Sequence, residues 1–508
     1  MSEGNEMLND QLLDDATDNR ESIGDSDLKS KAKSGFSWSI LIQLSHQFLN
    51  FVVSILLARL LAPADFGKVG IIMIFMSLGR ILLDGGLAPS LIRTKDPDQK
   101  DYSTVFVINV SAALIAYGLL FIFSPNITAY FKQTNDFTSL LRVYGIVLIL
   151  GSLTIVQSVR LNKNLQFKTQ FKLLLPSLII SGACAIWMAY HSFGVWSLVY
   201  KEIIFSSLAG VQLWYYSKWT PSLVFSKEKF LHHFRFSYKL LLNDLLYRVF
   251  NDTYKFLIGR FYSPAQLGLY TRAKSMEELP NGVIFNAINR VMFPLLAQVN
   301  DDNERLKRVY SMIITRVAFI LVPTFTVLGI MAKFIFIFLL TDKWVQSASY
   351  FQVLMFGSIF LPINAYNINI CKVKGRSDIV LKMSILELSL IAVGCFSAIP
   401  FGVYGLLYSL VGVALVKVLV SSSFTNKLIG YSTFEQLKDV SQPFLFSAIS
   451  AGIVMLYLAF IATAIHNNTL IMVTGISIFG LCYLLLGYFF RNEVLFQSMV
   501  WVKAKMKR

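Results

Sequence analysis

Residues 56–70 read LLARLLAPADFGKVG, and residues 257–273 read LIGRFYSPAQLGLYTRA. Each stretch places an arginine four residues before a proline and that proline four residues before a glycine. Proline and glycine build tight turns between helices, and an arginine at a helix end can extend toward lipid headgroups. We therefore interpret six residues as structural turn residues of an internal repeat: Arg59, Pro63, Gly67, Arg260, Pro264 and Gly268.

A second pair of similar stretches supports the repeat. Residues 193–200 read FGVWSLVY and residues 401–408 read FGVYGLLY, with five of eight positions identical. The alternative is that helical hairpins reuse such residues by chance, but two matches at nearly equal separations argue against it. Each copy holds six apolar runs, so the copies share one orientation, as in transporters that move two lobes around a central site.

The composition is that of a membrane protein. Of the 508 residues, 55% are hydrophobic and 15% are charged, and the mean hydropathy is +0.58. A soluble domain carries fewer apolar residues. The formal net charge is +16, although the first 28 residues hold nine acidic side chains and only one basic side chain. The cationic remainder fits loops that contact anionic headgroups, and it also suits an anionic substrate.

Apolar runs long enough to cross about 30 Å of hydrocarbon recur along the chain. We predict about fourteen transmembrane helices, near residues 36–61, 66–91, 103–123, 140–158, 173–191, 194–216, 236–259, 266–297, 309–340, 345–370, 380–399, 402–425, 442–463 and 468–490. The loops between them alternate between basic and nearly uncharged, and basic loops favour the cytoplasmic side. Lys29 and Lys31 precede the first run, and Lys503 and Lys505 follow the last. Both termini are therefore expected in the cytoplasm.

The predicted fold class is an all-α integral membrane protein with two parallel six-helix lobes and two C-terminal helices. The acidic N-terminal stretch lacks the basic start of a signal peptide, so we interpret it as a disordered tail. The predicted segments are this cytoplasmic tail (1–33), an N-lobe (34–217), a cytoplasmic linker (218–235), a C-lobe (236–425), the last two helices (442–490) and a basic cytoplasmic tail (491–508).

The two R-x₃-P-x₃-G stretches, with YTRA at 270–273 and ELP at 278–280, resemble the polysaccharide-transporter branch of the MOP flippase superfamily. Within it the likeness is to Wzx and teichuronic-acid-exporter-like lipopolysaccharide biosynthesis proteins, over about residues 33–490. The resemblance implies a V-shaped MOP/MATE-like bundle in the bacterial inner membrane, surrounded by membrane lipids. It also implies that alternating access moves an undecaprenyl-pyrophosphate-linked oligosaccharide, with a glycan polymerase or glycosyltransferase complex as partner.

Polar residues in the seventh predicted helix are candidates for substrate binding, because ionisable groups are costly in hydrocarbon. Asp244, Arg248, Asn251 and Asp252 share one helical face. A guanidinium group binds phosphate oxygens in a bidentate manner, so Arg248 is the candidate for the pyrophosphate. The alternative is a self-neutralising ladder of Asp244, Arg248 and Asp252 that only holds the helix in place.

Three further substrate-binding candidates come from the first two predicted helices. Gln47 and Asn50 form a milder polar face whose amides suit sugar hydroxyls. Arg80 is the third, and its pairing with Asp84 one turn later is the alternative. The following Gly85–Gly86 pair predicts a bend that opens a gap between helices.

Asp84 and Glu387 are candidates for ion coupling, since burial favours the protonated form of a carboxyl group. The alternative for Glu387 is an ion pair with Lys417 that joins two helices. A further cavity-facing polar patch is predicted in the tenth helix at Asn364, Asn367 and Asn369.

No metal site, disulfide framework, cofactor or nucleic-acid partner is expected. The cysteines are dispersed without a CxxC pair, at Cys184, Cys371, Cys395 and Cys482. The main alternative function is a MATE-like cation-coupled drug antiporter, which would favour an acidic cavity. An uncoupled lipid scramblase also remains open. An enzyme is not expected, because the predicted external loops are short and poor in catalytic residue types.

Overall fold

The computed structural model describes residues 45, 47–222, 224–461, 465 and 467–497 of the 508-residue chain. The predicted acidic tail, 1–33, and most of the predicted basic tail, 491–508, lie outside this part. Within the described residues the secondary structure is helical and contains no strand, so the all-α prediction is confirmed.

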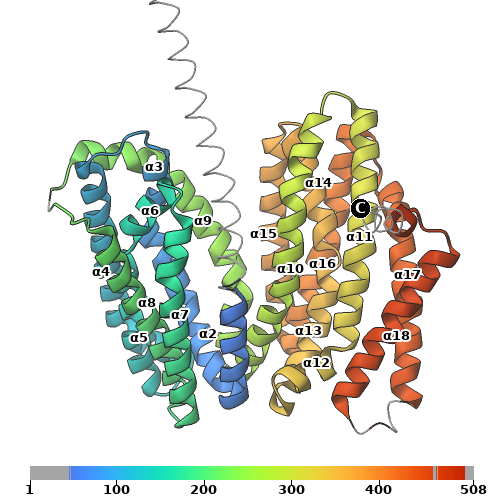
Figure 1. The fold of residues 1–508 in the computed structure, drawn as a ribbon, viewed down its shortest axis with the longest axis horizontal. Helices are drawn as coiled ribbons and strands as arrows, with labels where there is room; N and C mark the ends of the chain where they lie inside the picture. The colour runs from blue at the N-terminus through green and yellow to red at the C-terminus, as the bar shows by residue number, and fades with distance from the viewer. Residues whose placement is uncertain (1–44, 46, 223, 462–464, 466, 498–508) are drawn as a thin grey trace, which may run out of the picture. The chain divides into compact units, whose positions relative to one another are not determined.

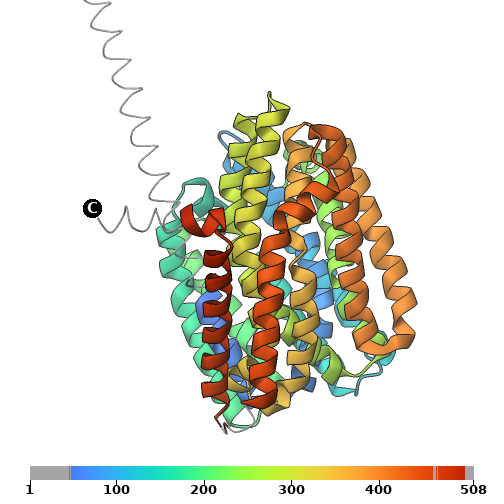
Figure 2. The ribbon, with the colours of Figure 1, turned by 90° about the vertical axis from the view of Figure 1, so that its right-hand side faces the viewer.

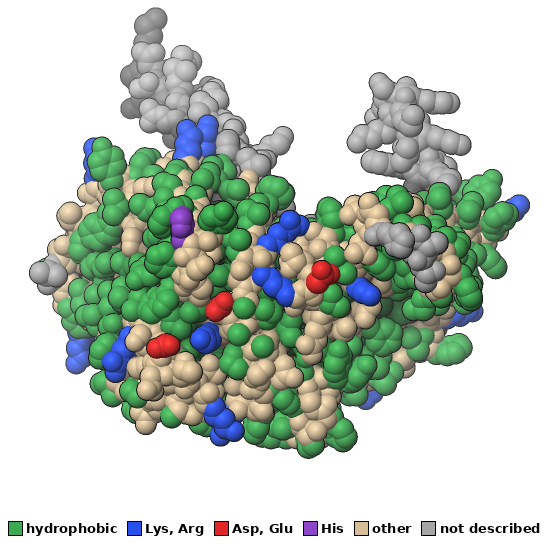
Figure 3. Space-filling view, turned by 90° about the horizontal axis from the view of Figure 1, so that it is seen from below, with side chains coloured by type: hydrophobic (Ala, Val, Ile, Leu, Met, Phe, Trp, Pro, Cys, Tyr) green, Lys and Arg blue, Asp and Glu red, His purple; other side chains and the backbone are tan. Residues whose placement is uncertain are grey.

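Nine helical stretches of the described chain are long and apolar enough to cross a membrane. One of them, Ser377–Ile429, contains two of the predicted helices. Large apolar side chains are exposed on these helices, among them Ile122, Trp187 and Phe396, as expected of surfaces that contact lipid. Figure 3 shows one face on which hydrophobic side chains predominate and charged ones are scattered. The count of fourteen transmembrane helices stays a prediction.

The chain forms two compact units. Unit 1 comprises Met1–Leu60 and Ile72–Val249, and unit 2 comprises Leu61–Ile71 and Phe250–Arg508. One boundary follows Leu60, and the other two fall inside the helices α2 (Pro63–Asp84) and α9 (Lys227–Phe261).

Unit 1 is a bundle in which α4 packs on α5, and α8 packs on both α5 and α7 (Figure 1). Besides α2 and α9 it contains the helix Gln47–Leu60, α3 (Leu87–Arg93), α4 (Gln99–Tyr130), α5 (Asp136–Ser152), α6 (Ile155–Lys163), α7 (Phe167–Tyr190) and α8 (Trp196–Ser217). The short helices α3 and α6 lie at one end of the unit. Leu91, Val105 and Val156 form part of a buried core that joins them to α4.

A buried polar network fixes the start of α9 at this end of unit 1. Asp101 of α4 accepts hydrogen bonds from Lys229 (2.9 Å) and from His233 (3.1 Å), and the other ring nitrogen of His233 lies 2.8 Å from the Ser90 hydroxyl. Burial lowers the pKa of His233, and the hydrogen bond to Asp101 raises the pKa of Lys229. A neutral His233 therefore donates through Nε2 to Asp101 and accepts through Nδ1 from Ser90. Because this network anchors α9 from Lys227 onward, the second half of the predicted linker is helical.

In the described residues, unit 2 adds nine α-helices to the parts of α2 and α9 that it contains. They are α10 (Pro264–Gln298), α11 (Asn303–Ile330), α12 (Ala332–Leu339), α13 (Val345–Ser358), α14 (Leu361–Val373), α15 (Ser377–Ala398), α16 (Gly402–Ile429), α17 (Thr433–Phe460) and α18 (Asn468–Phe489). α11 and α18 both pack on α17, and α15 packs on α16. Figure 2 shows α17 and α18 side by side at the front of the view.

Asn367 of α14 is a fully buried hydrogen-bonding centre of unit 2. Its Oδ1 accepts from Tyr310 (2.9 Å) and Thr425 (2.8 Å), and its Nδ2 donates to Ser421 (3.3 Å) and Gln436 (3.1 Å). These four bonds use the full capacity of the amide and join α14 to α11, α16 and α17. The prediction that Asn367 faces a cavity is therefore wrong. A buried amide without partners is costly, and the partners of this one come from helices far along the chain.

The two R-x₃-P-x₃-G copies pack against each other within unit 2. Pro63 and Pro264 are the first residues of α2 and α10, where a proline costs no helical hydrogen bond. Gly67 and Gly268 lie inside these helices, one turn later, rather than in the turns themselves. A Cβ on Gly67 would lie 1.7 Å from the carbonyl oxygen of Pro264, and a Cβ on Gly268 would lie 1.8 Å from that of Pro63. The glycines thus permit a close helix crossing, a requirement different from the turn that the spacing predicted.

We expect Gly67→Ala and Gly268→Ala each to destabilise the protein strongly, because the obstructing atom is a backbone oxygen that cannot rotate away. The unfolding temperature in detergent should fall by about 5 °C or more, as a loss of about 2 kcal/mol would produce. Gly118→Ala in α4 is the matched control, since nothing lies within 4 Å of its added Cβ. Its unfolding temperature should stay level or rise slightly, because alanine favours a helix by about 1 kcal/mol. Alanine variants of Gly67 and Gly268 that melt with the wild type would contradict the close crossing.

Candidate functional site

The polar face of α9 runs through the part of the helix that belongs to unit 1. Asp244 and Tyr247 are exposed, and the Asn243 amide donates to the Asp244 carboxylate (3.3 Å). Arg248 is half-buried and shares this face. Leu246 and Val249, on the opposite side of the same helix, are also exposed. α9 therefore presents one polar and one apolar surface, as expected of a helix between hydrocarbon and a hydrated space.

In unit 2 the same helix continues with Asn251 and Asp252. Asn251 is exposed, while Asp252 is buried and accepts from the Lys255 ammonium at 2.9 Å, one turn along the helix. The alternative to substrate binding was a self-neutralising ladder of Asp244, Arg248 and Asp252. The observed contact with Lys255 adds a second cation to this face.

Arg80 and Asp84 lie in the part of α2 that belongs to unit 1. Among the described residues they form no ion pair with each other; instead the Asp84 carboxylate accepts from the backbone N–H of Ala88 at 3.1 Å, at the start of α3. Asp84 is half-buried at the end of α2, and Asp244 of α9 is exposed.

The predicted bend at Gly85–Gly86 is present, since both residues have the positive φ that glycine favours. The gap that the bend was expected to open is filled by α9. Ser237 donates to the carbonyl oxygen of Gly86 at 2.8 Å, and a Cβ on Gly86 would lie 2.9 Å from the Ser237 carbonyl oxygen. The sequence could not reveal this partner because it lies far along the chain.

Gln47 and Asn50 lie half-buried on the helix Gln47–Leu60. The Asn50 side-chain oxygen accepts from Lys201 of α8 (3.5 Å), which also pairs with Glu202 (3.2 Å). The structure joins Lys201 and Glu202 to Asn50 as one polar cluster in unit 1.

Glu387 and Lys417 form the ion pair that the sequence analysis gave as the alternative to coupling. The two side chains lie 2.5 Å apart and join α15 to α16. The carboxylate of Glu387 is more than a third exposed, and the Lys417 side chain is mostly buried. The coupling role of Glu387 stays a proposal.

Glu277 of α10 is a buried acid whose partners the sequence did not reveal. Its carboxylate accepts from Ser358 of α13 (2.5 Å), from Asn281 (2.5 Å) and from Lys274 (2.6 Å). The one local signal was the spacing of Lys274 and Glu277, which places the two on the same helical face. The cluster joins two helices and leaves the acid neutralised.

Two units of long, mostly apolar helices, some of which carry ion pairs with a buried acid, define a polytopic membrane protein. The described residues contain no group of three or more His, Cys, Asp or Glu side chains able to hold a metal ion. The family follows from direct comparison. The family model described as "Polysaccharide biosynthesis protein" matches residues 56–349, so the chain belongs to this family, and the predicted likeness to the polysaccharide-transporter branch of the MOP superfamily is confirmed.

Relatives in bacteria are similar over most of their length. The teichuronic acid biosynthesis protein TuaB of Bacillus subtilis is 24% identical over 78% of this chain and 81% of its own. The succinoglycan biosynthesis transport protein ExoT of Rhizobium meliloti is 21% identical over 93% of this chain and 95% of its own. The lipopolysaccharide biosynthesis protein WzxC of Escherichia coli is 22% identical over 81% of this chain and 82% of its own.

Two solved structures share the fold. The lipid II flippase MurJ, in an inward closed conformation, has a TM-score of 0.68 and 16% identity and covers 90% of this chain and 100% of its own. An inward-facing MATE-family multidrug transporter has a TM-score of 0.55 and 15% identity and covers 77% of this chain and 99% of its own. The predicted MOP/MATE-like fold class is therefore confirmed.

Proposed function

We propose that this protein carries a lipid-linked oligosaccharide, with an undecaprenyl-pyrophosphate anchor, across the bacterial inner membrane for cell-surface polysaccharide synthesis. The polar face of α9 carries the proposal, because an exposed polar face is expensive in hydrocarbon unless it borders a hydrated path. Family membership and the fold shared with a lipid II flippase support it.

Within this proposal, each end of the substrate has chemically suited residues. Arg248 contacts the pyrophosphate through its guanidinium fork. The sugar hydroxyls, which both donate and accept, meet side chains that offer complementary groups. The proposed sugar-contacting residues are Asp244, Asn251, Asp252, Arg80, Gln47 and Asn50.

Transport by alternating access requires two lobes, which we propose to be residues 34–217 and 236–425, with 218–235 as the cytoplasmic linker. The repeated R-x₃-P-x₃-G and FGV stretches support two equivalent halves. The loop-charge pattern supports cytoplasmic termini. Assembly with a glycan polymerase or glycosyltransferase follows from the proposed pathway of the substrate.

Of the two coupling candidates, Asp84 fits the geometry better than Glu387. Among the described residues, the half-buried Asp84 carboxylate accepts from the Ala88 N–H and pairs with no cation, so it can take up a proton without breaking an ion pair. Glu387 already has Lys417 as a counter-ion at 2.5 Å. We therefore propose that a proton on Asp84 accompanies transport.

The first test reconstitutes the protein in liposomes with a fluorescent lipid-linked oligosaccharide and measures its movement between leaflets. Arg248→Ala should slow movement at least tenfold, since charge-assisted hydrogen bonds contribute about 1.5–3 kcal/mol. Arg235→Ala, an exposed arginine on the same helix outside the polar face, should transport like the wild type. If wild-type vesicles match protein-free vesicles while a cationic drug is transported, the MATE-like antiporter is the better account. If the Arg248→Ala variant moves the lipid-linked oligosaccharide at the wild-type rate, only the proposed role of Arg248 is contradicted.

A second test imposes a proton gradient on the same vesicles. Asp84→Asn should lose the dependence of transport on the gradient, because it cannot exchange a proton. The matched control replaces the other candidate with a neutral pair, Glu387→Gln with Lys417→Met, which leaves no unpaired buried charge. This control should keep the gradient dependence. The opposite pattern would assign coupling to Glu387 and refute the role of Asp84.

A further inference from the structure

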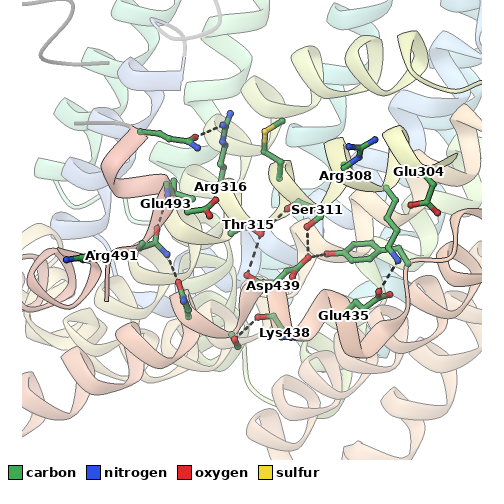
Figure 4. Close-up of a pocket in the computed structure, with 18 residues that line it drawn as sticks. Glu304, Arg308, Ser311, Thr315, Arg316, Glu435, Lys438, Asp439, Arg491 and Glu493 are labelled. Atoms are coloured by element: carbon green, nitrogen blue, oxygen red, sulfur yellow. Dashed lines mark hydrogen bonds and ion pairs between the residues drawn. The ribbon is translucent and has the colours of Figure 1, made fainter. Parts of the chain in front are cut away.

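Unit 2 contains a polar pocket of about 1000 Å³ between α11, α17 and the segment that follows α18 (Figure 4). Charged side chains of both signs line it in nearly equal numbers. The basic ones are Lys307, Arg308, Arg316, Lys438 and Arg491, and the acidic ones are Glu304, Glu435, Asp439 and Glu493. A lining with this balance suits a ligand that carries both charges better than a strongly anionic one.

One side of the pocket is built from groups that already have partners. Asp439 accepts from the hydroxyls of Ser311 and Tyr431, each at 2.5 Å. Lys307 pairs with Glu435 at 2.9 Å. These contacts hold α11 against the first turns of α17 and give this side of the pocket a fixed shape.

The opposite side offers charges that are still available. Among the described residues, the side chains of Lys438, Arg491 and Glu493 form no hydrogen bond or ion pair. Lys438 lies one turn before Gln442 on α17, and Arg491 directly precedes Asn492, whose amide donates to Gln442 at 2.7 Å. Lys438 of α17 and Arg491 of the segment after α18 therefore line the pocket from separate elements, together with the carboxylate of Glu493 (Figure 4).

An apolar groove of about 860 Å³ meets the pocket at this point. Ser441 and Gln442 line both spaces. Beyond them the groove runs along α17 past Leu437, Phe444 and Leu445 and is closed on its other sides by α16 and the start of α14. A charged pocket beside an apolar groove on the same helix matches a molecule with a charged head and a hydrocarbon chain.

We propose that this composite site binds a zwitterionic glycerophospholipid as a resident lipid. Its phosphate contacts Lys438 and Arg491, its ammonium group faces Glu493, and one acyl chain lies in the groove along α17. A free phosphate ion would use the cations but would leave the adjoining groove empty. The site lies on α17 and beside the end of α18, the two helices outside the predicted six-helix repeat, so the lipid would hold this added pair in place.

The test titrates the full-length protein in detergent with dioleoyl phosphatidylethanolamine and counts bound lipid by native mass spectrometry. The double variant Lys438→Gln with Arg491→Gln should bind about tenfold more weakly, because it removes both phosphate contacts. The control double variant, Arg305→Gln with Lys382→Gln, removes one arginine and one lysine that are exposed outside the site. It should bind like the wild type, and all forms should share one unfolding temperature in detergent without added lipid.

Competition identifies the ligand class. Inorganic phosphate and dioleoyl phosphatidylglycerol should each displace phosphatidylethanolamine poorly. Equal binding by the wild type and the Lys438/Arg491 variant would overturn the site. Displacement by inorganic phosphate at the same concentration as by lipid would show a simple anion site and contradict a lipid ligand. Preferential binding of phosphatidylglycerol would contradict a zwitterionic ligand. Preferential binding of undecaprenyl phosphate would assign the site to the transported lipid, which also contradicts a resident phospholipid.

Discussion

Hydrocarbon solvates neither peptide groups nor charges, and this constraint determines where each polar side chain of the chain can lie. Helices pair the backbone N–H and C=O groups with each other by hydrogen bonds. Buried charges find partners, as Asp101 does with Lys229 and His233, and as Glu277 does with Ser358. The polar face of α9 is different, because Asp244 and Tyr247 remain exposed in a helix whose opposite face is apolar. That contrast is the physical basis of the proposal that a hydrated path for a glycan runs along α9.

The same constraint explains why the two R-x₃-P-x₃-G copies matter beyond their loops. Each proline is the first residue of a helix, where its missing N–H costs no helical hydrogen bond. Each glycine, which has no side chain, lets the backbone of the other copy pack against its own helix. The contact is reciprocal: Gly67 meets Pro264, and Gly268 meets Pro63. A repeat whose copies pack on each other needs the same residues twice, which accounts for the equal spacing in both stretches.

Hydropathy, loop charge and the repeat were enough to predict the helical fold class, because these signals are local along the chain. The break at Gly85–Gly86 was also predictable, since adjacent glycines interrupt a helix. The packing of α9 against that break could not be predicted, and neither could the four partners of Asn367, because these contacts join distant residues. The early start of α9 was not predicted for the same reason. Its first residues are polar and were expected to form a linker, and the contacts of Lys229 and His233 with Asp101 and Ser90 join distant parts of the chain. At the candidate site, spacing predicted the shared face of α9 but not the pairing of Asp252 with Lys255.

The most direct measurement of the central claim is the water accessibility of α9. In a protein whose four cysteines are replaced by alanine, Tyr247→Cys and Asn251→Cys are placed on the polar face and Leu246→Cys on the apolar face. A membrane-impermeant thiol reagent, which reacts with the solvated thiolate, should label the first two positions, and lipid-linked oligosaccharide should protect them. Leu246→Cys should stay unlabelled in lipid. Equal labelling at all three positions, or labelling that the substrate leaves unchanged, would contradict a glycan path along α9.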